Sequence, residues 1–129
     1  MSHILLIEPD ALLKRTYQMA LEGDGYSVST ACDAQWAIDS ADTKRPDMVV
    51  LELQLAMHNG IEFLYEFRSY TEWQSVPVII QSLTPPGEFR AVPGLWSDLG
   101  VVAYLYKPRT TLALLLDSVS QYLNVAKVT

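Results

Sequence analysis

Short apolar runs alternate along the chain with segments in which apolar residues recur at helical spacing. Two of these runs, residues 4–7 and 48–53, are apolar throughout except for Glu52. Such runs are typical of strands buried on both faces of a parallel sheet. Residues 26–31 alternate polar and apolar side chains, as an edge strand with one wet face does. Further strands are predicted at 77–80 and 101–106.

Helical periodicity fills the intervals between the predicted strands. Apolar residues with this spacing predict four inward helix faces: Leu13, Tyr17, Ala20 and Leu21; Ala34, Ala37, Ile38 and Ala41; Ile61, Leu64 and Phe67; and Leu112, Leu115, Leu116, Val119 and Leu123. Asp33 is a predicted N-cap. Pro85-Pro86-Gly87 and Pro93-Gly94 interrupt the interval before residue 101, so the helix expected there is short, late-starting or broken.

Strands that alternate with helices predict a parallel sheet with right-handed crossovers and helices on both faces. The fold class is therefore α/β. We expect a three-layer α/β/α sandwich with a five-stranded sheet of order 2-1-3-4-5 and an irregular fourth helix. The 129 residues suffice for one ordinary core, so residues 1–129 are interpreted as a single domain.

Composition and charge exclude several classes of function. A formal net charge of -6 with no basic run disfavours direct binding of nucleic acid. No stretch approaches the roughly 18 apolar residues of a membrane span. Cys32 is the single cysteine and cannot form an internal disulfide, and no secretory signal precedes the first strand. These observations together predict a cytoplasmic protein.

Four chemically active side chains lie at the ends of the predicted strands. Glu8 follows the first strand, Glu52 the third, Ser82 the fourth and Lys107 the fifth. Ligands of open parallel sheets gather at the carboxyl ends of the strands, so one site is expected to contain all four. Two carboxylates, a hydroxyl and an ammonium group could bind a divalent cation and a phosphoryl group.

These positions, with their flanking residues, resemble the receiver domains of bacterial response regulators, which are related to the chemotaxis protein CheY and have a flavodoxin-like fold. The resemblance spans nearly the whole chain. It rests on five stretches in the right order: residues 4–10, residues 46–53, Asn59-Gly60, residues 77–82 and residues 104–108.

The resemblance implies a role for each site residue. Glu52 occupies the position of the aspartate that accepts phosphate, and Ser82 and Lys107 occupy the positions that contact the phosphoryl group. Glu8, with Asp10 nearby, forms the acidic pocket. Tyr104 falls where receivers carry an aromatic residue that switches between buried and exposed rotamers, although a tyrosine in a strand is also ordinary core.

Two departures from the family pattern change the expected chemistry. Pro9 stands where a second acid would help to hold magnesium, so Glu8 and Glu52 could bind Mg²⁺ only weakly. Asp10 is expected to cap the first helix rather than ligate metal. Glu52 is one methylene longer than aspartate, about 1.5 Å, and this should impair in-line attack on a phosphodonor. The longer arm should instead allow a direct ion pair with Lys107.

The sequence thus supports an atypical receiver domain in two-component signal transduction that is not an enzyme, needs no cofactor and acts without phosphorylation. Its protein partner, a kinase, an output domain or a second copy, would dock on the face formed by the fourth helix, the strand at 101–106 and the last helix. A phosphoacceptor receiver that uses Mg²⁺ and a histidine kinase remains the alternative. A flavodoxin-like binder of FMN or a nucleotide is the third, but Glu8-Pro9-Asp10 would repel a phosphate.

Three aromatic residues and one histidine lie outside the regular pattern. Trp73, Phe89 and Trp96 fall in loops or in the irregular fourth crossover. They would suit a partner surface if exposed, but burial under a loop explains them equally well. His58 has no partner at metal-ligand spacing and is interpreted as a loop residue.

Overall fold

A computed structural model describes residues 1–56, 59–90 and 94–128 of the chain. Its centre is one parallel sheet in the order β2-β1-β3-β4-β5, as predicted. The strands are β1 (His3–Ile7), β2 (Ser27–Ala31), β3 (Met48–Leu51), β4 (Val78–Ser82) and β5 (Val101–Tyr106). Each lies within two residues of its predicted bounds.

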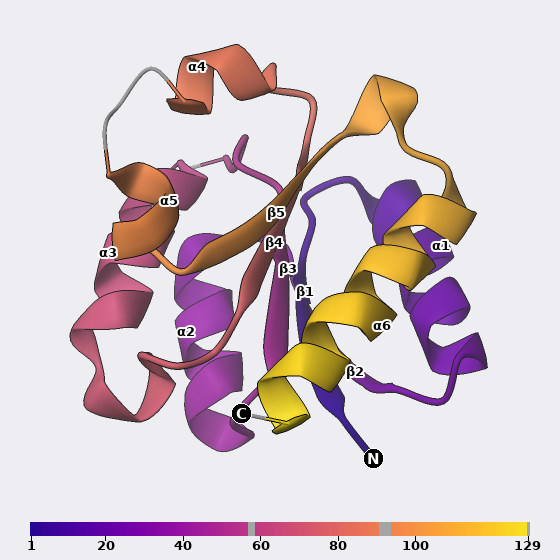
Figure 1. Cartoon of the computed structure of the whole chain (residues 1–129), viewed down its shortest axis with the longest axis horizontal. Helices are drawn as coiled ribbons and strands as arrows, with labels where there is room; N and C mark the ends of the chain where they lie inside the picture. Colours follow the sequence, from indigo (N-terminus) through magenta and orange to yellow (C-terminus); the bar gives the residue numbers. More distant parts are fainter. Residues whose placement is uncertain (57–58, 91–93, 129) are drawn as a thin grey trace.

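Helices cover both faces of this sheet, which confirms the three-layer α/β/α prediction (Figure 1). They are α1 (Ala11–Gly23), α2 (Ala34–Thr43), α3 (Gly60–Ser69), α4 (Pro86–Arg90), α5 (Leu95–Asp98) and α6 (Leu112–Val128), with 3₁₀ turns η1 (Thr71–Trp73) and η2 (Lys107–Arg109). The crossover between β4 and β5 contains the two short helices α4 and α5, which bears out the expected irregular fourth helix. The helix predicted as the fifth is α6.

Side-chain caps fix where the first three helices begin. Asp10, Asp33 and Asn59 each accept a hydrogen bond from the backbone amide three residues later, at 2.8–2.9 Å. These bonds satisfy amides that the first turn of a helix leaves unpaired. Gly60 follows the third cap where the backbone passes close to the end of β3: a Cβ there would lie 2.8 Å from the Cα of Leu53.

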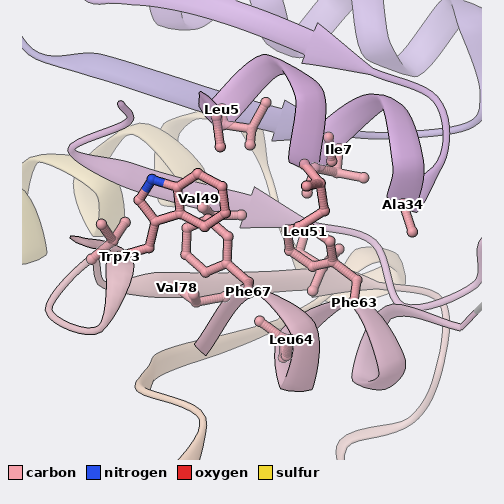
Figure 2. Close-up of a cluster of buried hydrophobic side chains, with 14 of the residues drawn as sticks. Leu5, Ile7, Ala34, Val49, Leu51, Phe63, Leu64, Phe67, Trp73 and Val78 are labelled. Carbon is pink, nitrogen blue, oxygen red and sulfur yellow. The ribbon is translucent and has the colours of Figure 1, made fainter. Parts of the chain in front are cut away.

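The core on one side of the sheet is built from β1, β3, β4, α2 and α3 (Figure 2). Phe67 stacks between Phe63 and Trp73, with ring centroids 5.4 and 4.9 Å apart. Trp73 is only 2% exposed, so it belongs to the core and not to a partner surface. Trp96 is partly buried against the same core. The side chain of Phe89 and the whole of His58 lie outside the described residues.

The opposite core lies between the sheet and helices α1 and α6. It contains the other face of β1 and β3, and the predicted stripe of α6 is largely confirmed because Leu115, Val119 and Leu123 are fully buried. Leu112 was wrongly placed on that stripe. It is 41% exposed, and it is the first residue of α6.

Arg68 ties the end of α3 to the loops at the amino ends of β4 and β5. Its guanidinium donates to the carbonyl oxygens of Trp73 (2.6 Å), Val76 (2.5 Å) and Leu99 (2.8 Å). Burial lowers the pKa of Arg68 below its ordinary value. A guanidinium has five N–H donors and no acceptor, so this one side chain can donate to three loop carbonyls at once.

None of the helices in the described part of the chain is long and apolar enough to cross a membrane.

Candidate functional site

Four predicted site residues meet at the carboxyl edge of the sheet. Glu8 follows β1, Glu52 follows β3, Ser82 ends β4 and Lys107 follows β5. Glu8, Glu52 and Ser82 are 2%, 3% and 0% exposed, and only 7% of the Lys107 side chain is exposed. The strand order places β1, β3 and β4 side by side, so the topology by itself brings the two carboxylates and the hydroxyl together.

Lys107 forms ion pairs with both buried carboxylates. Its Nζ lies 2.6 Å from Oε1 of Glu8 and 2.7 Å from Oε1 of Glu52. The predicted pair with Glu52 is therefore confirmed, and Glu8 is a second partner that was not anticipated. One ammonium group thus stands between two carboxylates that water barely reaches.

The Glu52 carboxylate accepts four hydrogen bonds. Oε1 accepts from Lys107 and from the backbone amide of Leu83 at 3.1 Å. Oε2 accepts from the hydroxyl of Ser82 and from the backbone amide of Gln54 at 3.0 Å. The amides of Leu83 and Gln54 were missed at the sequence level, because every residue except proline carries an amide and only the folded backbone decides which ones converge.

These contacts fix the charge of the two central groups. Burial alone raises the pKa of the Glu52 carboxyl, but hydrogen bonds from Lys107, Ser82 and Gln54 outweigh it, so the pKa lies below its ordinary value. Burial alone lowers the pKa of Lys107, but hydrogen bonds from its ammonium to Glu52 and Glu8 outweigh it and leave the pKa raised. Both groups are charged at neutral pH.

Asp10 caps a helix, as expected. Its side chain accepts from the amide of Leu13 at 2.9 Å. Its contribution to the acidic pocket comes from the backbone: the amide of Asp10 donates to Oε2 of Glu8 at 3.1 Å. Pro9 between them is exposed and has no side-chain oxygen.

A chain of hydrogen bonds leads from the carboxylate to Tyr104. Ser82 donates to Glu52 and its Oγ accepts from the amide of Thr84 at 3.0 Å. The carbonyl of Thr84 accepts from the hydroxyl of Tyr104 at 2.6 Å. Burial is the main reason that the pKa of Tyr104 is raised to about 12. The hydroxyl of Tyr104 is therefore bonded to the loop that follows β4. The ring centroids of Tyr104 and Trp96 are 6.1 Å apart.

Comparison with known proteins shows the class to which this fold and site belong. The family model of the response regulator receiver domain matches residues 4–119. The chain belongs to this family and is a response regulator receiver domain of two-component signalling.

Individual proteins agree with that assignment. The KDP operon transcriptional regulatory protein KdpE of Escherichia coli (strain K12) is 36% identical over 108 residues, which cover 84% of this chain and 45% of that protein. The alkaline phosphatase synthesis transcriptional regulatory protein PhoP of Bacillus subtilis (strain 168) is 35% identical over 106 residues, 81% of this chain and 42% of that protein. The chain thus spans less than half the length of these relatives, which are signalling regulators.

Solved structures support the fold. Chemotaxis protein CheY4 of Vibrio cholerae superposes with a TM-score of 0.83 at 21% identity, covering 94% of this chain and 98% of that one. The CheY-like, flavodoxin-like architecture expected from the sequence is therefore confirmed.

Proposed function

We propose that this receiver domain acts without phosphorylation, because the carboxylate of Glu52 takes the place that a phosphoryl group would take on an aspartate. The observation that carries the proposal is the set of four donors on Glu52: an ammonium, a hydroxyl and two backbone amides. These donor types are those that hold a phosphoryl group, and charge-assisted bonds are the strongest of them. In other receivers a glutamate at this position can resemble a partly activated state.

The same contacts disfavour phosphorylation of Glu52. A carboxylate oxygen must offer a free lone pair and a clear path for in-line attack. Both oxygens of Glu52 already accept two hydrogen bonds each, and the side chain is 3% exposed. A phosphodonor would have to displace Lys107 or Ser82 before any bond could form.

Magnesium fits these residues poorly. Mg²⁺ needs near-octahedral oxygen ligation, and the carboxylates of Glu8 and Glu52 are both paired with Lys107. Pro9 offers no side-chain oxygen, and the side chain of Asp10 is used by the helix cap. Within the described residues, no group of three or more His, Cys, Asp or Glu side chains could hold a metal ion. We therefore propose a domain that functions without Mg²⁺.

Receiver domains act by binding kinases and output domains, and the proposed function needs such a partner. We propose a cytoplasmic role in which a protein docks on the face of α4, β5 and α6. Tyr104 of β5 is joined to Glu52 through Thr84 and Ser82, so this face would be held in one arrangement by the buried carboxylate. The similar transcriptional regulators are more than twice as long as the matched region, which makes an output domain or a second receiver suitable partners.

A receiver that still accepts phosphate is the second candidate, favoured by the presence of Ser82 and Lys107 at the family's phosphoryl-contact positions. Intact mass after incubation with Mg²⁺ and acetyl phosphate separates the two. We expect no adduct on the wild-type chain, while an aspartate-bearing receiver treated in parallel gains one phosphoryl group. A stoichiometric, base-labile adduct that disappears in Glu52→Gln would contradict the proposal.

A further inference from the structure

A hollow of about 390 Å³ lies between α2 and the edge strand β2. It is lined by Ser29, Trp36, Asp39, Ser40, Thr43 and Lys44. None of these residues belongs to the site around Glu52. The volume falls within the range of pockets that bind small molecules.

The hollow follows from the pattern of α2. Ala37, Ile38 and Ala41 face the core, whereas Trp36, Ser40 and Thr43 recur at helical spacing along the neighbouring flank. Because β2 is an edge strand, no further strand covers this flank. A strip of hydroxyl groups and one indole is left facing the edge of the sheet.

A buried histidine behind the hollow holds the hydroxyl of Ser29, one of the lining residues. His3 is 5% exposed, with its Nδ1 2.9 Å from Oγ of Ser27 and its Nε2 2.8 Å from Oγ of Ser29. Lys44 donates to the same Ser27 hydroxyl at 3.2 Å. The hydroxyl of Ser29, which lines the hollow, is thus held by the imidazole of His3, and the other ring nitrogen of His3 is fixed by Ser27. A fixed hydroxyl loses little freedom when a ligand binds to it.

The wall is an exposed indole. Trp36 is 62% exposed, although a tryptophan is one of the largest apolar side chains and is usually mostly buried. Its flat face offers apolar contact area, and its position beside three hydroxyl-bearing residues gives the hollow both an apolar and a polar side.

The charges of the lining balance. Asp39 and Lys44 are its only ionisable residues, one acidic and one basic. The hollow therefore has no net preference for an anion or a cation. Hydroxyls act both as donors and as acceptors, the carboxylate accepts and the ammonium donates. A ligand that complements this lining is neutral, has several hydroxyl groups and presents an apolar face to an indole.

We propose that this hollow binds a neutral polyhydroxylated ring, a monosaccharide or the sugar of a nucleoside, with its C–H face packed against Trp36 and its hydroxyls bonded to Ser29, Ser40 and Thr43. The site is independent of Glu52 and does not rest on the proposed mode of signalling. It would give the domain a ligand input along α2, from Trp36 in the first turn of that helix to Lys44 just after its last residue.

Titration of the ¹⁵N-labelled chain with D-glucose, D-ribose and adenosine tests the assignment. The two free sugars are small and should bind with a Kd of about millimolar, and adenosine should bind more tightly only if its base also makes contacts. We expect at least one of the three to cause saturable shifts at the amides of Ser29 and Ser40 and at the indole N–H of Trp36. Binding of ribose would show that a free sugar suffices, whereas binding of adenosine without binding of ribose would show that the base is needed as well.

Two variants complete the test. Trp36→Ala should weaken binding at least about tenfold and remain folded, because the side chain is exposed; Tyr65→Ala, which removes another exposed aromatic on α3, should leave binding unchanged. Absence of saturable shifts at the hollow with all three probes would overturn the proposal. Unchanged binding in Trp36→Ala, or binding of a charged amino acid in preference to every sugar, would also overturn it.

Discussion

Replacement of Lys107 by methionine should lower the free energy of unfolding by about 3–5 kcal/mol at pH 7, the usual cost of removing one partner from a buried ion pair. The ammonium group lies within 2.7 Å of two carboxylates, and without it Glu8 and Glu52 would be buried together with no positive charge between them. Urea unfolding followed by circular dichroism measures the change.

The ion pairs also make the free energy of unfolding depend on pH. In the wild type the pKa of Glu52 is below its unfolded value, so its stabilisation is present above about pH 4.5 and is lost as pH falls through the folded pKa. The pKa of Lys107 is raised, so its stabilisation is present below about pH 10.5 and is lost as pH rises through the folded value. These two groups by themselves leave stability nearly constant between these limits. Burial lowers the pKa of His3 below its ordinary value of 6.5, so the fold also loses some stability as pH falls below about 6.5.

In Lys107→Met the change of stability at acidic pH should have the opposite sign from that of the wild type. With the cation gone, burial and mutual repulsion favour protonated carboxyl groups, so the variant should become more stable as pH falls from 7 towards 5. Adding Glu52→Gln should recover part of the loss. Lys44→Met is the control, because Lys44 is exposed and should cost less than about 1 kcal/mol. A loss for Lys107→Met no larger than the control, with the wild-type pH profile, would show that the ion pairs do not stabilise the fold.

Replacement of Arg68 by methionine should cost about 3 kcal/mol or more, because the carbonyls of Val76 and Leu99 would lose the guanidinium donor in a half-buried site. The carbonyl of Trp73 would keep only the backbone amide of Val76 as a donor. The loss should be nearly independent of pH between 5 and 9, since no carboxylate pairs with this guanidinium among the contacts described. That independence separates it from Lys107→Met in the same unfolding assay.

Arg45→Met is the matched control for Arg68. Arg45 also donates to a backbone carbonyl, that of Glu72 at 3.0 Å, but its side chain is exposed and water can replace it. We expect less than about 1 kcal/mol from its removal. Equal losses at the two arginines would mean that the bonds of Arg68 to the loops are no more important than a surface contact.

The fold was predictable because its signals are local and repeated. The runs at residues 4–7 and 48–51, which form most of β1 and all of β3, are continuously apolar. Proline and glycine mark the broken fourth crossover. The convergence of Glu8, Glu52, Ser82 and Lys107 followed from the topology alone. The ion pair of Glu52 with Lys107 followed from the length of the glutamate side chain.

What the sequence did not reveal depends on tertiary packing. Trp73 stands in a segment that looks like a loop, and only its packing against Phe67 of α3 and the rest of that core buries it. The amides of Gln54 and Leu83 have no side-chain signature. Arg68 looks like a surface arginine at the end of a helix until its carbonyl partners are placed. The role of His3 is equally hidden in the sequence, because its partners Ser27 and Ser29 are brought beside it only when β2 pairs with β1.

The claim that Glu52 fills the phosphoryl site is tested most directly with beryllofluoride, a non-covalent analogue of a phosphoryl group on a carboxylate. Amide spectra of the ¹⁵N-labelled wild type are recorded with Mg²⁺ and increasing beryllofluoride, and an aspartate-bearing receiver serves as the positive control. We predict no saturable shift at Gln54, Leu83 or Thr84, because the Glu52 carboxylate already holds the donors that the analogue would need. Saturable shifts at these three amides in the wild-type chain, absent in Glu52→Gln, would contradict the account.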